Sequence, residues 1–147
     1  SKVLDVNLVA VFRAIQLFTP LLHAAATPSS PARVIHISSI NGIDPPPMPT
    51  YAYSTSKAAV NMLSRHLAVS LAPSVTVNSI APGPFRSRMM RGTLRGTGEE
   101  TIAAGTLLRR IGAPSDIAGA AHFPSEATLV LASYHPPPRP GGRAHAT

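Results

Sequence analysis

Residues 33–60 read RVIHISSINGIDPPPMPTYAYSTSKAAV, and they contain most of the pattern from which the fold class follows. The short β-branched run that ends in two serines predicts a buried strand over residues 33–39. The four prolines that come next cannot donate ladder hydrogen bonds, so we expect residues 43–50 to form an extended loop. The stretch rich in Ala, Leu and Met over residues 52–71 predicts a helix.

Two further elements flank this stretch. Residues 75–80, VTVNSI, predict a second strand, which Pro82 and Gly83 bring to an end. Upstream, apolar residues recur at helical spacing over residues 3–26. A strand, a helix and a strand in this order imply a right-handed parallel βαβ unit, so the sequence predicts an α/β fold.

The sequence beyond the second strand gives weaker signals. Glycines at positions 92, 96, 98 and 105 indicate a mobile segment. Pro114 opens a further helical pattern, for which Ser115 is the expected N-cap. From Tyr134 onward the chain is rich in Pro, Gly and Arg, a composition that predicts a disordered tail.

Composition excludes several classes of protein. The chain has no cysteine and no clustering of its six histidines, so we expect no disulfide and no metal site. No apolar run reaches the roughly 18 residues that span a bilayer, so we expect no membrane segment and a cytoplasmic protein. A net charge of +7 raises the question of nucleic acid, but no nucleic-acid-binding signature accompanies it, and we expect no such partner. The arginines cluster over residues 86–95, which indicates either a local anion site or a solvated loop.

The residues with the clearest chemistry are Tyr53 and Lys57. Residues four apart share one face of a helix, so the two side chains can point at the same site. An ammonium beside a phenol favours the phenolate, with an attraction of roughly 4 kcal/mol at about 4 Å and an effective dielectric near 20. Tyr51 competes for this role, but the residue four positions after it is Thr55, which carries no charge. Tyr53 and Lys57 are therefore the candidate proton-transfer pair.

Other polar groups are expected at the same edge of the sheet. Ser38 and Ser39 end the first predicted strand, while Pro82 and Gly83 follow the second, and open α/β folds bind ligands at this carboxyl edge. Asn7 lies within an apolar helix, where an amide needs a structural or catalytic partner. A hydrolase of the Ser-His type is not indicated, because the Gly-x-Ser-x-Gly elbow is absent.

Four motifs together resemble the short-chain dehydrogenases/reductases. They are Asp5-Val-Asn7-Leu, Ile37-Ser-Ser39-Ile-Asn-Gly42, Tyr53-x-x-x-Lys57 and Asn78-Ser-Ile-Ala-Pro82-Gly83, in the family's order and spacing over about residues 2–123. The resemblance implies the C-terminal half of a Rossmann-like, doubly wound parallel sheet. It implies a partial catalytic domain over residues 1–123 and a divergent, disordered tail over residues 124–147.

The resemblance also implies an activity. The protein would interconvert a ketone, of the 3-oxoacyl type if the similarity to ketoacyl reductases holds, and a secondary alcohol by hydride transfer with NADP, NAD not being excluded. Tyr53 would exchange a proton with the substrate oxygen, and Lys57 would hold the nicotinamide ribose. Ser39 would stabilise developing charge on the substrate oxygen, and Asn7 would anchor a relay water. The residues around the nicotinamide would be Tyr53, Lys57, Ile80, Pro82, Gly83 and Ser87, the last standing where the family usually has Thr.

Two more expectations follow from what the family has and this chain lacks. The Gly-rich turn that holds the cofactor pyrophosphate after the family's first strand has no counterpart, so the alternative is a truncated, catalytically inactive member. The predicted strands would then keep an unpaired edge and an uncovered face. The predicted helices over residues 3–26 and 52–71 are apolar around much of their circumference, and the corresponding helices of related enzymes pair with one another. We therefore expect a homo-oligomer, a tetramer, that acts on a small-molecule ketone or alcohol.

Overall fold

A computed structural model describes residues 1–122 and 130–132. Its sheet has three parallel strands in the order β1 (Ala32–Ile37), β2 (Val75–Ala81) and β3 (Val130–Ala132). Strands β1 and β2 run in register from the pair Ala32 and Val75 to the pair Ile37 and Ile80. The predicted strands are therefore confirmed, with each boundary within two residues of its expected place.

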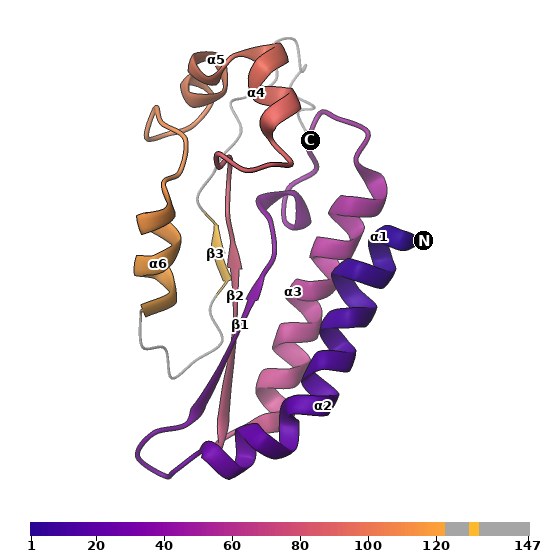
Figure 1. The fold of residues 1–147 in the computed structure, drawn as a ribbon, viewed down its shortest axis with the longest axis vertical. Helices are drawn as coiled ribbons and strands as arrows, with labels where there is room; N and C mark the ends of the chain where they lie inside the picture. The colour runs from indigo at the N-terminus through magenta and orange to yellow at the C-terminus, as the bar shows by residue number, and fades with distance from the viewer. Residues whose placement is uncertain (123–129, 133–147) are drawn as a thin grey trace, which may run out of the picture.

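Helices cover both sides of this sheet. α2 (Ala10–Ala25) and α3 (Tyr51–Leu71) lie on one side, and α6 (Pro114–His122) lies on the other (Figure 1). α3 connects β1 to β2, which confirms the predicted βαβ unit. This arrangement of helices on both faces of a parallel sheet is the predicted Rossmann-like α/β architecture.

The hydrophobic core lies between the sheet and the helices α2 and α3. It is formed by Ile15, Leu71, Val75 and Val77, each less than a tenth exposed. Along β2 the buried positions alternate at first, and then residues 79–81 are all buried. Burial on both faces is typical of an inner strand of a parallel sheet, so the carboxyl end of β2 is enclosed on both sides.

The N-terminal helix is nearly continuous. α1 (Lys2–Leu4), the π-helical turn η1 (Asp5–Val9) and α2 follow one another directly, and the last turns of α2, which contains Pro20, bend away (Figure 1). This confirms the helix predicted over residues 3–26. By length and mean hydropathy, 1.5 in its most apolar window, Lys2–Ala25 could cross a bilayer, so the expectation that no segment reaches this length was wrong. The helix packs against α3 and β1, however, as one layer of the domain.

The segment after β2 differs from its prediction. Two short helices, α4 (Arg91–Thr97) and α5 (Glu99–Ala104), occupy the stretch whose glycines indicated a mobile segment. Gly98 joins them with a φ of 85°, in the left-handed region that favours glycine. At least this glycine therefore serves a tight connection between two helices.

The start of α6 corrects the expected N-cap. Ser115 lies inside the helix, because the helix already begins at Pro114. The carboxylate of Asp116 accepts a hydrogen bond from the backbone N–H of Ala113 at 2.8 Å and also pairs with Arg110. These bonds, that from Arg110 first, lower the pKa of Asp116 to about 2. Asp116 therefore supplies the side-chain acceptor for a backbone N–H at the start of the helix, the role that was expected of Ser115.

Strand β3 was not predicted, and it lies within the stretch 124–147 that was expected to be a disordered tail. The remainder of that stretch, together with residue 123, falls outside the described residues. At the opposite edge of the described sheet, β1 carries Ile35 and Ile37, which are 38% and 48% exposed. The intervening His36 is buried against Ser64 of α3, so the two isoleucines belong to the other face. The expected open edge is thus present in the described part of the sheet, and the face of β1 that carries the two isoleucines is partly uncovered.

Candidate active site

Lys57 lies at the meeting point of α3 and the end of β1. Its Nζ donates a hydrogen bond of 2.9 Å to the carbonyl oxygen of Ile37, the last residue of the strand. The same Nζ lies 5.8 Å from the centre of the Tyr53 ring. Partial burial lowers the pKa of Lys57. An ammonium has three donors, so the bond to Ile37 leaves two for a ligand.

Burial separates the two tyrosines at the start of α3. Tyr53 is half-buried beside Lys57, whereas Tyr51 is 78% exposed. The hydroxyl of Thr55 donates a hydrogen bond of 2.8 Å to the backbone carbonyl of Tyr51. Among the described residues, a cation therefore lies at the ring of Tyr53 and not at that of Tyr51.

The two serines after β1 have different partners. Ser38, buried, donates a hydrogen bond of 2.9 Å to the backbone carbonyl of Lys57 and so ties the strand end to α3. Ser39 caps the 3₁₀ turn η2 (Ile40–Gly42), because its Oγ accepts a hydrogen bond of 3.2 Å from the N–H of Asn41. That bond uses an oxygen lone pair and not the hydroxyl proton, so Ser39 keeps a donor for a substrate oxygen.

Asn7 is connected to α3 through Ser56. The amide Nδ2 of Asn7 donates to Ser56 Oγ at 3.0 Å, and Ser56 Oγ in turn donates to the backbone carbonyl of Tyr53 at 2.7 Å. Asn7 lies in the π-helical turn η1, and π-turns are frequent at functional sites. The structure therefore brings Asn7 close to the helical turn that carries Tyr53.

Sequence reasoning missed a glycine contact that positions Lys57. A Cβ added to Gly42 would lie 2.6 Å from the backbone carbon of Lys57 and 2.7 Å from the backbone nitrogen of Ala58. Gly42 therefore lets η2 lie directly against the backbone of α3. The only signal in the sequence was the glycine's place three residues after Ser39.

Asn61 was also missed, although it lies one helical turn beyond Lys57. Its Oδ1 accepts a hydrogen bond of 2.9 Å from Ser79 on β2. Its Nδ2 donates to the carbonyl oxygen of Gly42 at 3.4 Å, the long end of hydrogen-bond range. Asn61 thus links the second strand and the η2 turn to the helix that carries the candidate catalytic pair.

The residues expected around the nicotinamide divide into two groups. Ile80 and Pro82 lie at the end of β2, and both are hydrogen-bonded to the segment that follows β1. The carbonyl oxygen of Ile80 accepts a hydrogen bond of 2.7 Å from the Ser38 N–H. The carbonyl oxygen of Pro82 accepts one of 3.0 Å from the Ile40 N–H. Gly83 follows them and is half-buried. Ser87 is exposed and belongs to a separate pocket beyond this edge.

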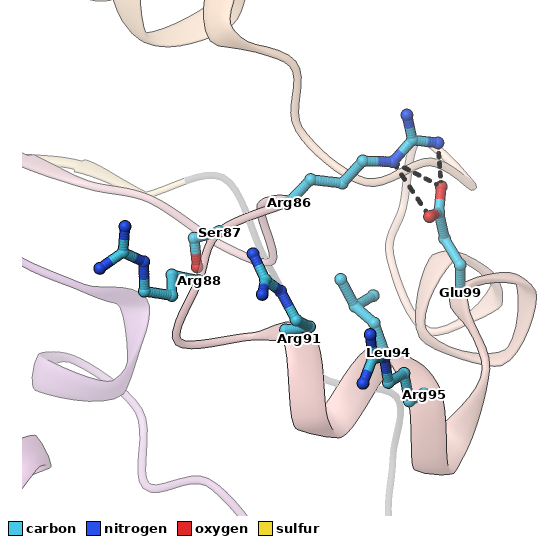
Figure 2. Close-up of a pocket in the computed structure, with 7 residues that line it drawn as sticks. All are labelled: Arg86, Ser87, Arg88, Arg91, Leu94, Arg95 and Glu99. Carbon is cyan, nitrogen blue, oxygen red and sulfur yellow. Dashed lines mark hydrogen bonds and ion pairs between the residues drawn. The ribbon is translucent and has the colours of Figure 1, made fainter.

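That pocket is formed by the segment after β2 and the helices α4 and α5, and it measures about 450 Å³. It is lined by Arg86, Ser87, Arg88, Arg91, Leu94, Arg95 and Glu99, and we call it the arginine pocket (Figure 2). Arg86 turns toward Glu99, whose two carboxylate oxygens accept hydrogen bonds from Arg86 Nε at 3.1 and 3.0 Å. These bonds lower the pKa of Glu99 and raise that of Arg86.

The spacing of three glycines in this region resembles the spacing found in a pyrophosphate-binding turn. Gly92, Gly96 and Gly98 have the spacing Gly-x-x-x-Gly-x-Gly. A phosphate turn of this kind must follow a strand and open a helix, whereas Gly92 and Gly96 lie inside α4. A Cβ at either of these two positions would meet no atom within 4 Å, so neither glycine serves a close backbone approach. The spacing therefore does not mark the missing pyrophosphate turn.

The chain is similar to several known proteins. A family profile described as enoyl-(acyl carrier protein) reductase matches residues 1–127. The chain is 48% identical over 92 residues to the rhamnolipids biosynthesis 3-oxoacyl-[acyl-carrier-protein] reductase of Pseudomonas aeruginosa, which covers 62% of this chain and 36% of that protein. It is 35% identical over 129 residues to dehydrogenase/reductase SDR family member 4 of Bos taurus, covering 84% of this chain and 43% of that one.

Solved structures show the same fold. The RhlG/NADP active-site complex of Pseudomonas aeruginosa superposes with a TM-score of 0.77 at 36% identity, covering 88% of this chain and 56% of that one. A putative short-chain dehydrogenase/reductase from Burkholderia xenovorans superposes with a TM-score of 0.74 at 28% identity, covering 89% and 52%. The chain therefore spans about half the length, or less, of the relatives it matches.

Proposed function

The chain belongs to the short-chain dehydrogenase/reductase family of oxidoreductases, and on that premise we propose that it interconverts a ketone and a secondary alcohol by NADP-dependent hydride transfer. The observation that carries this proposal is the placement of Lys57. Its ammonium is tied to the carboxyl end of β1 and lies 5.8 Å from the ring centre of Tyr53. The relative that is a 3-oxoacyl reductase makes a 3-oxoacyl compound our proposed substrate class.

The residues present fit the nicotinamide end of such a cofactor. Lys57 has two donors left for ribose hydroxyls, and Pro82 and Gly83 lie at the carboxyl edge of the sheet, where open α/β folds bind nucleotides. The bound cofactor supplies or accepts the hydride. We propose NADP because structures similar to this one are NADP complexes, and NAD remains the alternative.

Tyr53 acts as the proton donor to the substrate oxygen in the reductive direction. After donation the ring carries a negative charge, which the Lys57 ammonium stabilises. At 5.8 Å and an effective dielectric near 20 the attraction is about 3 kcal/mol, and solvent at this half-buried site reduces it.

Ser39 and Asn7 complete the proposed site. The hydroxyl proton of Ser39 is free to bond the substrate oxygen as charge develops on it. Asn7 holds the first turns of α3 through Ser56, and we propose that its carbonyl oxygen anchors the water that relays protons through Lys57. Both residues therefore act at the face of α3 that carries Tyr53.

The test compares Tyr53→Phe with Tyr51→Phe in a complete version of the protein, one that includes a nucleotide-binding half, and follows the NADPH-dependent reduction of a 3-oxoacyl thioester. Removing the Tyr53 hydroxyl should lower turnover by about 10²–10⁴-fold, the usual contribution of a general acid, while circular dichroism stays unchanged. Tyr51→Phe should leave turnover near its original value, because that side chain is 78% exposed. Similar losses in both variants would contradict the assignment.

A second candidate is a family member without catalytic activity. It is favoured by the described residues, in which no Gly-rich turn joins a strand to a helix. Titration of the chain with NADPH and NADH distinguishes the two. Saturable binding of either nucleotide supports the enzyme, and no binding up to millimolar nucleotide supports the inactive member.

We also propose a homo-oligomer, most simply a tetramer. Helices α2 and α3 leave apolar side chains exposed on the side away from the sheet, namely Leu17, Phe18, Leu21, Met62 and Val69. Apolar area of this kind marks an interaction surface more often than a free one. A second copy of the same helices would cover it with matching chemistry.

A further inference from the structure

Asn61 continues the row of side chains formed by the candidate pair. It follows Lys57 by four residues along α3, as Lys57 follows Tyr53. The two polar atoms of its amide reach different elements. Oδ1 accepts a hydrogen bond of 2.9 Å from the hydroxyl of Ser79, and Nδ2 donates to the carbonyl oxygen of Gly42 at 3.4 Å. Asn61 therefore joins β2 to the end of the η2 turn through α3.

The chemistry of these two partners leaves the amide of Asn61 one orientation. A backbone carbonyl can only accept, so the atom that faces Gly42 is the donor Nδ2. Turning the amide over would bring two acceptor oxygens together at Gly42. Ser79 is fully buried, so its hydroxyl needs an acceptor inside the protein, and Oδ1 provides it. The strand and the turn therefore both fix the same orientation of the side chain.

The η2 turn is constrained in two directions at Gly42. A Cβ at this position would overlap the backbone of Lys57, so the turn already lies against α3 and cannot approach it more closely. The hydrogen bond from Asn61 opposes movement the other way, because it links η2 directly to α3. Contact on one side and a hydrogen bond on the other together set the separation of the turn and the helix.

The direction of the Ser39 side chain depends on this turn. The backbone around Ser39 is fixed by β2, because the N–H groups of both neighbouring residues donate to carbonyl oxygens at the end of that strand, at 2.7 and 3.0 Å. The side-chain torsion is set separately, by the N–H of Asn41, which donates to Ser39 Oγ at 3.2 Å. Asn41 lies within η2, so a turn that moves at Gly42 also moves the bond that aims this hydroxyl.

We propose that Asn61 is a positioning residue, which holds the η2 turn at Gly42 and so aims the Ser39 hydroxyl at the substrate oxygen, a role that rests on the proposed function. Asn61 acts here through Ser39 and not by contact with the substrate. Ser79 supports the same role, because its hydroxyl orients the amide from the strand side. The row Tyr53, Lys57 and Asn61 thus carries the proton donor, the cation and the group that places the third polar residue of the site.

The test uses a complete version of the protein, one that includes a nucleotide-binding half, and compares Asn61→Leu, Ser39→Ala and the two changes combined. Leucine has a similar size and neither amide atom. Asn61→Leu should lower kcat in the reduction of a 3-oxoacyl thioester by about 10- to 10²-fold, the cost of a misplaced group, with the Kd for NADPH within about twofold of the original. In the combined variant kcat should equal that of Ser39→Ala, because no hydroxyl is left to aim. Losses that multiply, or an unchanged kcat in Asn61→Leu, would overturn the proposal.

A second set of variants separates positioning from stability. Asn61→Leu leaves the buried hydroxyl of Ser79 without its acceptor and should lower the free energy of unfolding. Asn61→Leu/Ser79→Ala removes that hydroxyl too, so stability should recover while kcat stays as low as in Asn61→Leu. Ser79→Ala alone keeps the bond to Gly42 and should keep kcat near its original value. If kcat recovers together with stability in the double variant, Asn61 has a structural role only.

Amide exchange gives a readout that does not depend on the reaction. The N–H groups of Asn41 and Gly42 both donate to Ser39, and they should exchange about tenfold faster in Asn61→Leu/Ser79→Ala than in Ser79→Ala. Equal exchange rates in these two variants would show that Asn61 does not hold the turn. Arg65→Leu, an exposed site one helical turn further along α3, is the matched control and should change neither exchange nor kcat.

Tyr53→Phe in the same assay reports on the proposed function by itself. If Tyr53→Phe loses turnover and Asn61→Leu does not, the positioning role is wrong and the proposed function stands. If Tyr53→Phe keeps its turnover, the proposed function is wrong, and the aim of Ser39 at a substrate oxygen falls with it, whatever the exchange rates of η2.

Discussion

Replacing Gly42 by alanine tests whether the contact between η2 and α3 positions the candidate active site. The new Cβ would lie 2.6 Å from the backbone carbon of Lys57, where ordinary contacts begin at about 3.4 Å. Of the three atoms nearest to it, two belong to the backbone and the third is the Lys57 Cβ, which side-chain rotation does not move, so no change of rotamer relieves the overlap. The turn and the helix must therefore move apart by about 0.8 Å.

A movement of this size acts directly on the hydrogen bond from Ser38 to the backbone carbonyl of Lys57. That bond measures 2.9 Å, and a lengthening of 0.8 Å takes it beyond the usual range. Overpacking costs about 1–3 kcal/mol, and a buried Ser38 without its acceptor costs about 1–3 kcal/mol more. The two costs overlap because the structure relaxes, so we expect Gly42→Ala to destabilise the protein by about 2–4 kcal/mol.

The assay is urea unfolding followed by circular dichroism, with Gly119→Ala as the control. Gly119 lies inside α6, and a Cβ there meets no atom within 4 Å. This control should stabilise the protein by about 0.5–1 kcal/mol, the propensity difference between glycine and alanine in a helix. If Gly42→Ala unfolds at the same urea concentration as the original chain, the contact does not constrain α3 and the reasoning fails.

Five other predictions use the same structure. Lys57→Met should weaken NADPH binding at least tenfold and abolish most turnover. The reason is that one ammonium contacts Ile37, Tyr53 and the proposed ribose. If nucleotide affinity and turnover both stay at their original levels, Lys57 has no role in the site. Burial lowers the pKa of His36, so its folded form resists protonation, and stability should fall as pH drops below 6.5; His36→Asn should remove this slope from a series of unfolding curves. Asp116 has a lowered pKa of about 2, so the stabilisation that its carboxylate gives α6 is complete above pH 3.8 and is lost as pH falls through 2. Asp116→Asn should lack this stabilisation at neutral pH, and amide exchange in the first turn of α6 should be faster. Finally, the 147-residue chain alone should show no saturable, Tyr53-dependent NADPH oxidation, because positioning of the cofactor ordinarily supplies roughly 7–11 kcal/mol, and light scattering of the intact protein should show an oligomer, with a monodisperse monomer at micromolar concentration as the contrary result.

Local sequence was sufficient for the fold class and for placing the candidate pair Tyr53 and Lys57 on one face of a helix. Strand and helix patterns depend on periodicity within one segment, and the βαβ order then restricts the topology to very few choices. The relation of Tyr53 to Lys57 is likewise local, because one helical turn brings the two side chains to the same face. Sequence alone also indicated an anion site among the arginines of residues 86–95, beside the alternative of a solvated loop.

Other features depended on contacts between residues far apart in the chain. The different partners of Ser38 and Ser39, the approach of Gly42 to the backbone of Lys57 and the bridge made by Asn61 arise only when the strand ends pack on α3. The unexpected strand β3 likewise exists by pairing with β2, which lies about fifty residues earlier in the sequence. Periodicity describes how one segment buries a face, whereas these contacts are set by how closely two folded segments approach each other, and that distance is a property of the packed tertiary structure.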